Sequence, residues 1–178
     1  MARIEHITLG GGCFWCLEAV YDQVRGVTEV ESGYCNGHVR QPSYEQVCTG
    51  HTGHAEVVRL GFDAERISLD ELLQIFFSIH DPTTLNRQGS DIGPQYRSGI
   101  YLHEESQRAV AEAVKAEANR AWGGRVVTEI LPLANYWPAE AYHQRYYENH
   151  PNQGYCAYVV GPKVAKFRET FVSRLKLA

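Results

Sequence analysis

The stretch Ile4-Glu-His-Ile-Thr-Leu9, followed by Gly10-Gly-Gly12 and Cys13-Phe-Trp-Cys16, decides how this chain begins to fold. Its first six residues are predicted to form a short strand, which the three glycines end. From Cys13 onward the apolar residues recur at three- and four-residue spacing, which predicts a helix closing near Gly26. The stretch therefore predicts a strand and a helix joined by a glycine-rich turn, with Cys13 in the first helical turn.

Strands and helices alternate along the rest of the chain. Strands are predicted at residues 27–34, 55–62, 98–102 and 126–133. Helices are predicted from a capping box at 68–71, over 104–122, over 139–149 with Pro138 in the first turn, and from 163 to about 175. This order predicts a mixed α/β sandwich in which helices cover one sheet. The long irregular stretch at 81–97 is a candidate functional loop.

Length, composition and charge exclude several classes of protein. The 178 residues, 44% hydrophobic and 21% charged, are expected to form a single domain over 1–178. A net charge of −4 without a basic run argues against nucleic acid and anionic membranes as partners. The longest apolar stretch, 72–79, is far shorter than the ~20 residues a membrane span needs. We expect a cytoplasmic protein, since polar residues occupy the position of a secretory signal. We also expect a monomer.

The sulfur-containing residues also indicate a reducing compartment. Five cysteines stand at positions 13, 16, 35, 48 and 156, and an odd number is unlike a secreted disulfide scaffold. The single methionine is Met1. Methionine is readily oxidised, so a chain almost without it suits a protein that meets oxidants.

Cys13 is the strongest candidate for chemistry. The N–H groups and the positive dipole end of a following helix would stabilise its thiolate. Cys16 would place a second sulfur one turn away. A CxxC pair alone is also compatible with inert packing, disulfide exchange or zinc binding. Zinc is disfavoured because the other cysteines are too far apart to supply a second close pair of ligands.

Glu56 is the second candidate. Its parity along the strand at 55–62 places it with Val58, Leu60 and Phe62, on the face expected to be buried. A buried carboxyl group is either paired or keeps its proton near neutral pH, which suits a general acid. The alternative is that Glu56 lies at an exposed end of the strand.

Seven blocks of sequence together resemble the A-type peptide methionine sulfoxide reductases. They stand in the order found in that family and cover most of residues 10–156. The blocks are Gly12–Trp15, Pro42–Cys48, Gly53–Val58, Asp81–Thr83, Asn86–Gly89, Asp91–Ser98 and Gly154–Cys156. The resemblance implies a two-layer α+β sandwich with a ferredoxin-like core and a long C-terminal coil.

The resemblance also implies an activity. The protein would repair oxidative damage by reducing methionine sulfoxide, free or in proteins, without a cofactor or metal. It would act on the S epimer and be recycled by thioredoxin.

The resemblance assigns roles to individual side chains. Cys13 would attack the sulfoxide sulfur, and Glu56 would protonate the sulfoxide oxygen. Tyr44 and Tyr96 would hydrogen-bond that oxygen, and Asp91 would help to organise the site. These roles fit the chemistry, because a sulfoxide oxygen leaves sulfur readily only when it is protonated, and buried donors are little screened.

The resemblance also identifies the residues that would form the apolar wall of the substrate site and the thiol that would resolve the oxidised Cys13. Phe14 and Trp15 would receive the S-methyl group. Cys156 would condense with the oxidised Cys13 and form a disulfide, because it matches the resolving cysteine of the family. Cys16 stands where many members have glycine. It could resolve or relay the disulfide, although bridging Cys13 within one turn would strain the helix.

The remaining candidates are interpreted as structural. Cys35 is expected to be a packed thiol, and Cys48 is expected to pack in the core in a strand context. His54 and His143 also lie in stretches that match the family. Either could orient a group of the site, and the preferred expectation is that both are satisfied structural histidines. Two rival functions remain. One is a redox-sensing thiol protein that uses Cys13 and Cys16, and the other is a thioredoxin-like oxidoreductase that acts on protein disulfides.

Overall fold

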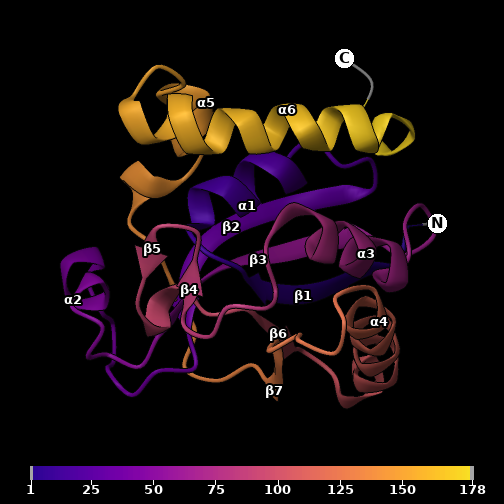
Figure 1. The fold of residues 1–178 in the computed structure, drawn as a ribbon, viewed down its shortest axis with the longest axis horizontal. Coiled ribbons are helices and arrows are strands. Elements are labelled where there is room, and N and C mark those ends of the chain that lie inside the picture. Colours follow the sequence, from indigo (N-terminus) through magenta and orange to yellow (C-terminus); the bar gives the residue numbers. More distant parts are fainter. Residues whose placement is uncertain (1, 177–178) are drawn as a thin grey trace.

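The computed structural model describes residues 2–176 and is built on a six-stranded sheet (Figure 1). The strand order is β7-β6-β1-β3-β2-β8, and every neighbouring pair is antiparallel except β6 and β7. The strands are β1 (Ile4–Gly10), β2 (Val27–Cys35), β3 (Ala55–Asp63), β6 (Gly99–Leu102), β7 (Glu129–Pro132) and β8 (Trp137–Pro138). The sheet and its helices confirm the predicted mixed α/β architecture.

Helices lie along this sheet and at its ends. In Figure 1, α1 runs beside β2 with α5 and α6 above it, while α4 lies at the opposite end near β7. The helices are α1 (Phe14–Tyr21), α2 (Tyr44–Cys48), α3 (Leu69–Ile79), α4 (Arg108–Ala121), α5 (Tyr146–Asn149) and α6 (Gly161–Thr170). Among residues 2–176, none of the helices combines the length and the apolar character needed to cross a bilayer.

The chain order explains how the site residues come together. The elements β1-α1-β2-β3-α3-β6 follow the βαββαβ connectivity of ferredoxin-like folds, with β1 and β3 in the middle of the sheet. Two segments interrupt this order. Helix α2 is inserted between β2 and β3, and the small β4–β5 hairpin (Arg87–Gln88 and Asp91–Ile92) is inserted between α3 and β6. Both insertions contain predicted site residues.

The central strand β3 is buried on both faces. Val58, Leu60 and Phe62 lie in the main core, which also holds buried residues of α1 and α3. Residues of opposite parity form a second, smaller cluster that includes Cys35 and Tyr101. Cys35 is fully buried there, which confirms the prediction of a packed thiol.

The segment around residue 138 differs from its prediction. Instead of one helix over 139–149, Pro138 ends strand β8 beside Gly33, and only a 3₁₀ turn (Ala141–His143) and the short α5 follow. Arg145 has a left-handed backbone with φ of 55°, which interrupts any continuous helix. Where the resemblance implies a long C-terminal coil, residues 133–155 have only short elements. Beyond Cys156 the described chain is helical, through α6 and a final 3₁₀ turn.

Cys48 also differs from its prediction. It lies at the end of α2 and is exposed, so it does not pack in the core from a strand. The helix begins at a capping box in which Ser43 and Gln46 each bond the other's backbone N–H. The pattern Ser-x-x-Gln was visible in the sequence and could have revealed this helix.

Candidate active site

Cys13 is the N-cap of α1, and its carbonyl oxygen accepts a hydrogen bond of 3.1 Å from the Cys16 N–H. It therefore precedes the first helical turn rather than lying in it. Gly12 has φ of 90°, and a Cβ atom there would lie 2.6 Å from Cγ of Gln88. Only glycine suits this conformation and this close approach, so the glycine-rich turn fixes the position of the Cys13 side chain.

Burial decides the protonation of Cys13. The side chain is only 7% exposed, and burial raises the pKa of its thiol well above the ordinary value. The neighbouring Glu56 and Cys16 raise this pKa further, while the Trp15 N–H lowers it. The expectation that the helix terminus stabilises a resting thiolate is therefore wrong, because burial outweighs the backbone donor.

Glu56 is buried, as its strand parity predicts, with 1% of its surface exposed. The Phe14 N–H donates to its Oε1 atom at 3.2 Å, while Oε2 has no hydrogen-bond partner in the described structure. Burial raises the pKa of this carboxyl group to about 8, even though the Phe14 N–H acts to lower it. At neutral pH the group is therefore an acid with a proton available beside the start of the Cys13 helix.

Tyr44 and Tyr96 come from the two insertions and lie near this acid. Tyr44 begins α2, and Tyr96 ends the 3₁₀ turn Pro94–Tyr96. Both rings are half-buried, and burial followed by the charge of Glu56 raises the pKa of each hydroxyl. Cys13 has a smaller effect in the same direction on both. Both hydroxyls therefore remain hydrogen-bond donors near the sulfur and the acid.

Asp91 is tied to a residue that sequence reasoning missed. The Tyr155 hydroxyl donates to Oδ2 of Asp91, and it also hydrogen-bonds the Cys16 side chain. Burial and the nearby Cys13 and Cys16 thiols raise the pKa of Tyr155. Tyr155 therefore connects the β4–β5 hairpin to the cysteine helix from the position directly before Cys156.

Aromatic rings surround the first turn of α1. Phe14 is fully buried, and the half-buried Trp15 stacks on Tyr146 at a centroid distance of 3.9 Å. The Trp15 Nε1–H donates to Nδ1 of His143 at 3.1 Å. The His143 ring also lies 4.3 Å from that of Tyr44.

His143 has a hydrogen-bond donor to spare. It is 1% exposed, and its Nε2 atom has no partner among the described residues. Burial lowers its pKa, so the ring is neutral, and its proton is on Nε2 because Nδ1 accepts from Trp15. The expectation that both ring nitrogens have hydrogen-bond partners therefore holds for Nδ1 and not for Nε2. Nothing in the sequence distinguishes this histidine from a structural one.

The other two candidate thiols also lie inside the protein. Cys16 is 3% exposed and Cys156 is fully buried. Burial raises the pKa of Cys16 to about 11; the Lys163 charge lowers it, and Cys156 raises it slightly. Cys16 thus interacts electrostatically with both Cys13 and Cys156. Cys156 begins a π-helical turn, Cys156–Val160, that leads into α6.

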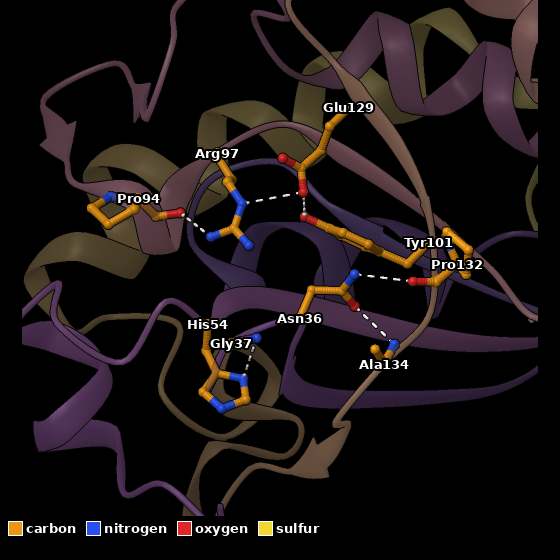
Figure 2. Close-up of polar contacts among 9 residues, drawn as sticks. All are labelled: Asn36, Gly37, His54, Pro94, Arg97, Tyr101, Glu129, Pro132 and Ala134. Atoms are coloured by element: carbon orange, nitrogen blue, oxygen red, sulfur yellow. Dashed lines mark hydrogen bonds and ion pairs between the residues drawn. The ribbon is translucent and has the colours of Figure 1, made fainter. Parts of the chain in front are cut away.

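His54 and Arg97 each hold nearby backbone in place through side-chain hydrogen bonds (Figure 2). The Gly37 N–H donates to Nδ1 of His54 at 3.3 Å, and His54 Nε2 bonds the Val39 carbonyl at 2.6 Å, as expected for a satisfied histidine. Arg97 pairs with Glu129 at 3.2 Å and donates to the Pro94 carbonyl at 2.9 Å. Arg97 thereby holds the 3₁₀ turn that carries Tyr96.

No three His, Cys, Asp or Glu side chains within residues 2–176 gather as possible metal ligands. The described site is therefore made of thiols, one buried acid, phenol groups and apolar rings. Such a set can transfer protons to a buried oxygen and carry out sulfur–sulfur chemistry.

Comparison with known proteins identifies the family. A family model described as peptide methionine sulfoxide reductase matches residues 5–175. The chain is 53% identical over 174 residues to peptide methionine sulfoxide reductase MsrA of Saccharolobus solfataricus, with 98% of each chain covered. The structure of reduced Mxr1 from Saccharomyces cerevisiae is similar, with a TM-score of 0.80 and 38% identity over 86% of this chain and 90% of that one. Mxr1 in complex with Trx2 matches with a TM-score of 0.56 and 29% identity, over 81% and 85%. The chain belongs to the peptide methionine sulfoxide reductase family.

Proposed function

We propose that this methionine sulfoxide reductase works through Cys13 as the nucleophile and Glu56 as the proton donor. One observation carries the proposal. A carboxyl group that keeps its proton at neutral pH, with one oxygen unpartnered, lies against the backbone of the residue next to Cys13. The same arrangement would be costly for a protein that only packed its core, because a buried polar atom without a partner is destabilising.

The first step moves one oxygen atom and conserves protons. Cys13 Sγ attacks the sulfoxide sulfur while Glu56 gives its proton to the sulfoxide oxygen, and the thiol proton of Cys13 replaces it. The attack forms a bond between Cys13 Sγ and the substrate sulfur, and the sulfur–oxygen bond of the substrate breaks as hydroxide leaves. Hydroxide then bonds Cys13 Sγ while the bond between the two sulfurs breaks, so methionine leaves and Cys13 becomes a sulfenic acid. Tyr44 and Tyr96 stabilise the charge on the oxygen by hydrogen bonds, and the apolar Phe14 and Trp15 rings receive the S-methyl group.

The second step restores a disulfide. The Cys156 thiol attacks the Cys13 sulfenic acid, water leaves, and a Cys13–Cys156 disulfide forms. Cys16, which interacts electrostatically with both other thiols, relays the disulfide outward by thiol–disulfide exchange. A dithiol must then reduce it. The complex of Mxr1 with Trx2 supports thioredoxin as that dithiol.

Three further statements belong to the same proposal. The substrate is the S epimer, free or in a damaged protein chain, as the family resemblance implies. The protein acts as a single catalytic domain. It works in the cytoplasm, because its thiols must be reduced between turnovers and reducing compartments maintain that state.

The experiment separates reduction of sulfoxide from general thiol oxidation. Reduced protein is mixed with methionine S-sulfoxide without a reductant, and the methionine formed is quantified; peroxide oxidation of the thiols is measured in parallel. We expect Glu56→Gln to slow methionine formation by about 100-fold or more while leaving thiol oxidation almost unchanged.

Cys13→Ser is the matched control and should form no methionine. Equal loss of both activities in Glu56→Gln would favour a redox-sensing protein. Reduction of a protein disulfide such as that of insulin, without sulfoxide reduction, would favour a thioredoxin-like oxidoreductase.

A further inference from the structure

A cavity lies apart from Cys13, between α3, the end of α4 and α6. Its volume is about 510 Å³, which is within the range of small-molecule sites. One face of α6 lines it with residues spaced three and four apart, among them Lys163, Lys166 and Phe167. The end of α3 and Trp122, which follows α4, supply the opposite wall.

The interior of this cavity is largely aromatic. Phe77 and Phe167 are buried and line it, while Phe171 and Trp122 are half-buried beside them. Flat rings around a space of this size favour a flat apolar ligand, because offset-stacked and edge-to-face ring contacts add to simple burial.

Two cations face this space without counterions. The ammonium groups of Lys163 and Lys166 form no ion pair or side-chain hydrogen bond with any other residue in the described range 2–176. Lys163 lies close enough to His80, which also lines the cavity, to lower the pKa of that ring. Asp81 is the acid in the lining, and its Oδ1 atom already accepts two hydrogen bonds from Thr83.

We propose that this cavity binds a small aromatic carboxylate, with its ring among the phenylalanine and tryptophan side chains and its carboxylate at Lys163 and Lys166. A carboxylate would supply the counterion that the two lysines lack, through charge-assisted hydrogen bonds. A neutral ligand would bury the rings and leave both cations unpaired. Charge complementarity therefore selects the acid over the neutral analogue.

The proposed site adjoins the catalytic turn but does not include it. His80 and Gln88 both line the cavity, and they pack against Gly11 and Gly12 on their other sides. These two side chains form the wall between a bound carboxylate and the backbone that precedes Cys13.

The test measures binding to the resting reduced enzyme, so its result does not depend on sulfoxide turnover. The probe is 2-naphthylacetate, titrated against ¹⁵N-labelled protein while the indole N–H signals of the three tryptophans are followed. Trp122→Phe identifies the signal of Trp122. We expect that signal to shift with a dissociation constant of about 1 mM or tighter, as ligand efficiency predicts for a molecule of this size.

Charge removal provides the decisive comparison. In the Lys163→Gln/Lys166→Gln variant, the dissociation constant should rise at least about fivefold, because two partly screened charge contacts are lost. The neutral analogue 2-(2-naphthyl)ethanol should bind the native enzyme more weakly than the acid by a similar factor. Lys115→Gln, on α4 and outside the cavity lining, is the matched control and should bind the probe like the native protein.

Three outcomes would overturn the proposal. They are the absence of a Trp122 shift at saturating probe, equal binding of the acid and the neutral analogue, and unchanged affinity in the double lysine variant. Lys166 is exposed and Lys163 is half-buried, and circular dichroism of the double variant verifies that it is folded.

Discussion

At the scale of single residues, the turn before Cys13 shows why glycine is needed there. Gly12 combines a φ of 90° with a Cβ position only 2.6 Å from the Gln88 side chain. Gly124 has a similar φ of 78°, but no atom lies within 4 Å of its Cβ position. Both glycines have a left-handed backbone, but only Gly12 has a close steric contact. Substitutions at the two positions therefore distinguish the cost of backbone strain from the cost of the contact.

We predict that Gly12→Ala lowers the free energy of unfolding by about 2–4 kcal/mol, as measured by urea denaturation. Gly124→Ala, the matched control, should lose only about 1–2 kcal/mol from the backbone alone. Gly12→Ala should also slow methionine formation, since Cys13 follows directly. Equal losses of stability in the two variants would show that the Gln88 contact has no energetic role.

The burial of a single residue could be predicted from the sequence where it depends only on which face of a strand the residue occupies. Strand alternation places Glu56 on the inner face, and the structure confirms that it is buried. The role of His143 was not resolved and Tyr155 was not found, because the importance of both depends on partners far away in the chain. Trp15 lies 128 residues from His143, and Asp91 lies 64 residues from Tyr155. Spacing rules do not describe such contacts.

At the scale of elements, the segment that leads to Cys156 is held at both ends, by Gln144 and Tyr146 at its start and by Tyr155 at its end. The Tyr146 N–H donates to the buried Glu18 carboxylate at 3.2 Å, and Gln144 bonds the Ser32 backbone. Residues 148–154 beyond this anchor are exposed. Residues 148–154 can therefore change conformation without unfolding the sheet, whereas Cys156 itself is buried and its neighbour Tyr155 donates to Asp91.

We predict that one turnover of Cys156→Ser, without reductant, leaves Cys13 as a sulfenic acid that a trapping reagent captures. A disulfide between Cys13 and Cys16 is disfavoured, because both lie at the start of α1 and the bond would distort its first turn. Mass spectrometry identifies the product. An intact Cys13–Cys16 disulfide in this variant would make Cys16 the direct resolving thiol.

The prediction of a helix was wrong where the same residue type is favourable in two kinds of element. Proline fits the first turn of a helix, but it also fits an edge strand, and Pro138 occupies the edge strand β8. Tertiary contacts decide between these options: β8 pairs with Gly33 of β2. Helix α2 was missed because it has only five residues and therefore no apolar periodicity.

At the scale of the whole molecule, the proton on Glu56 links stability to pH. The pKa of this carboxyl group is raised from 4.5 to about 8 by folding. The folded protein therefore holds a proton that the unfolded chain has lost between these pH values. The stabilisation is fully present below about pH 4.5 and is lost as pH rises through about 8.

We predict that Glu56→Gln gains stability relative to the native protein as pH rises from 5 to 8. The difference in the free energy of unfolding should grow by ~1.4 kcal/mol per pH unit at most, since glutamine carries no titrating proton. Urea denaturation at several pH values measures it. A difference that does not change with pH would mean that Glu56 ionises normally in the folded protein.

The fold as a whole was largely predictable, because the alternation of strands and helices requires a layered sheet with helices on it. The arrangement of the site was not. Tyr44 and Tyr96 reach the acid on two insertions that interrupt the βαββαβ order, and only the folded sheet brings these insertions to one edge of α1.

The most direct test of the account is the titration of Glu56 itself. Protein labelled with ¹³C at glutamate carboxyl groups is followed by NMR across pH, and Glu56→Gln identifies the signal. We expect the Glu56 carboxyl to be protonated at pH 7 and to titrate near pH 8. A midpoint near the ordinary value of 4.5 would show that Glu56 has no proton to give at neutral pH, and would contradict its role as the acid.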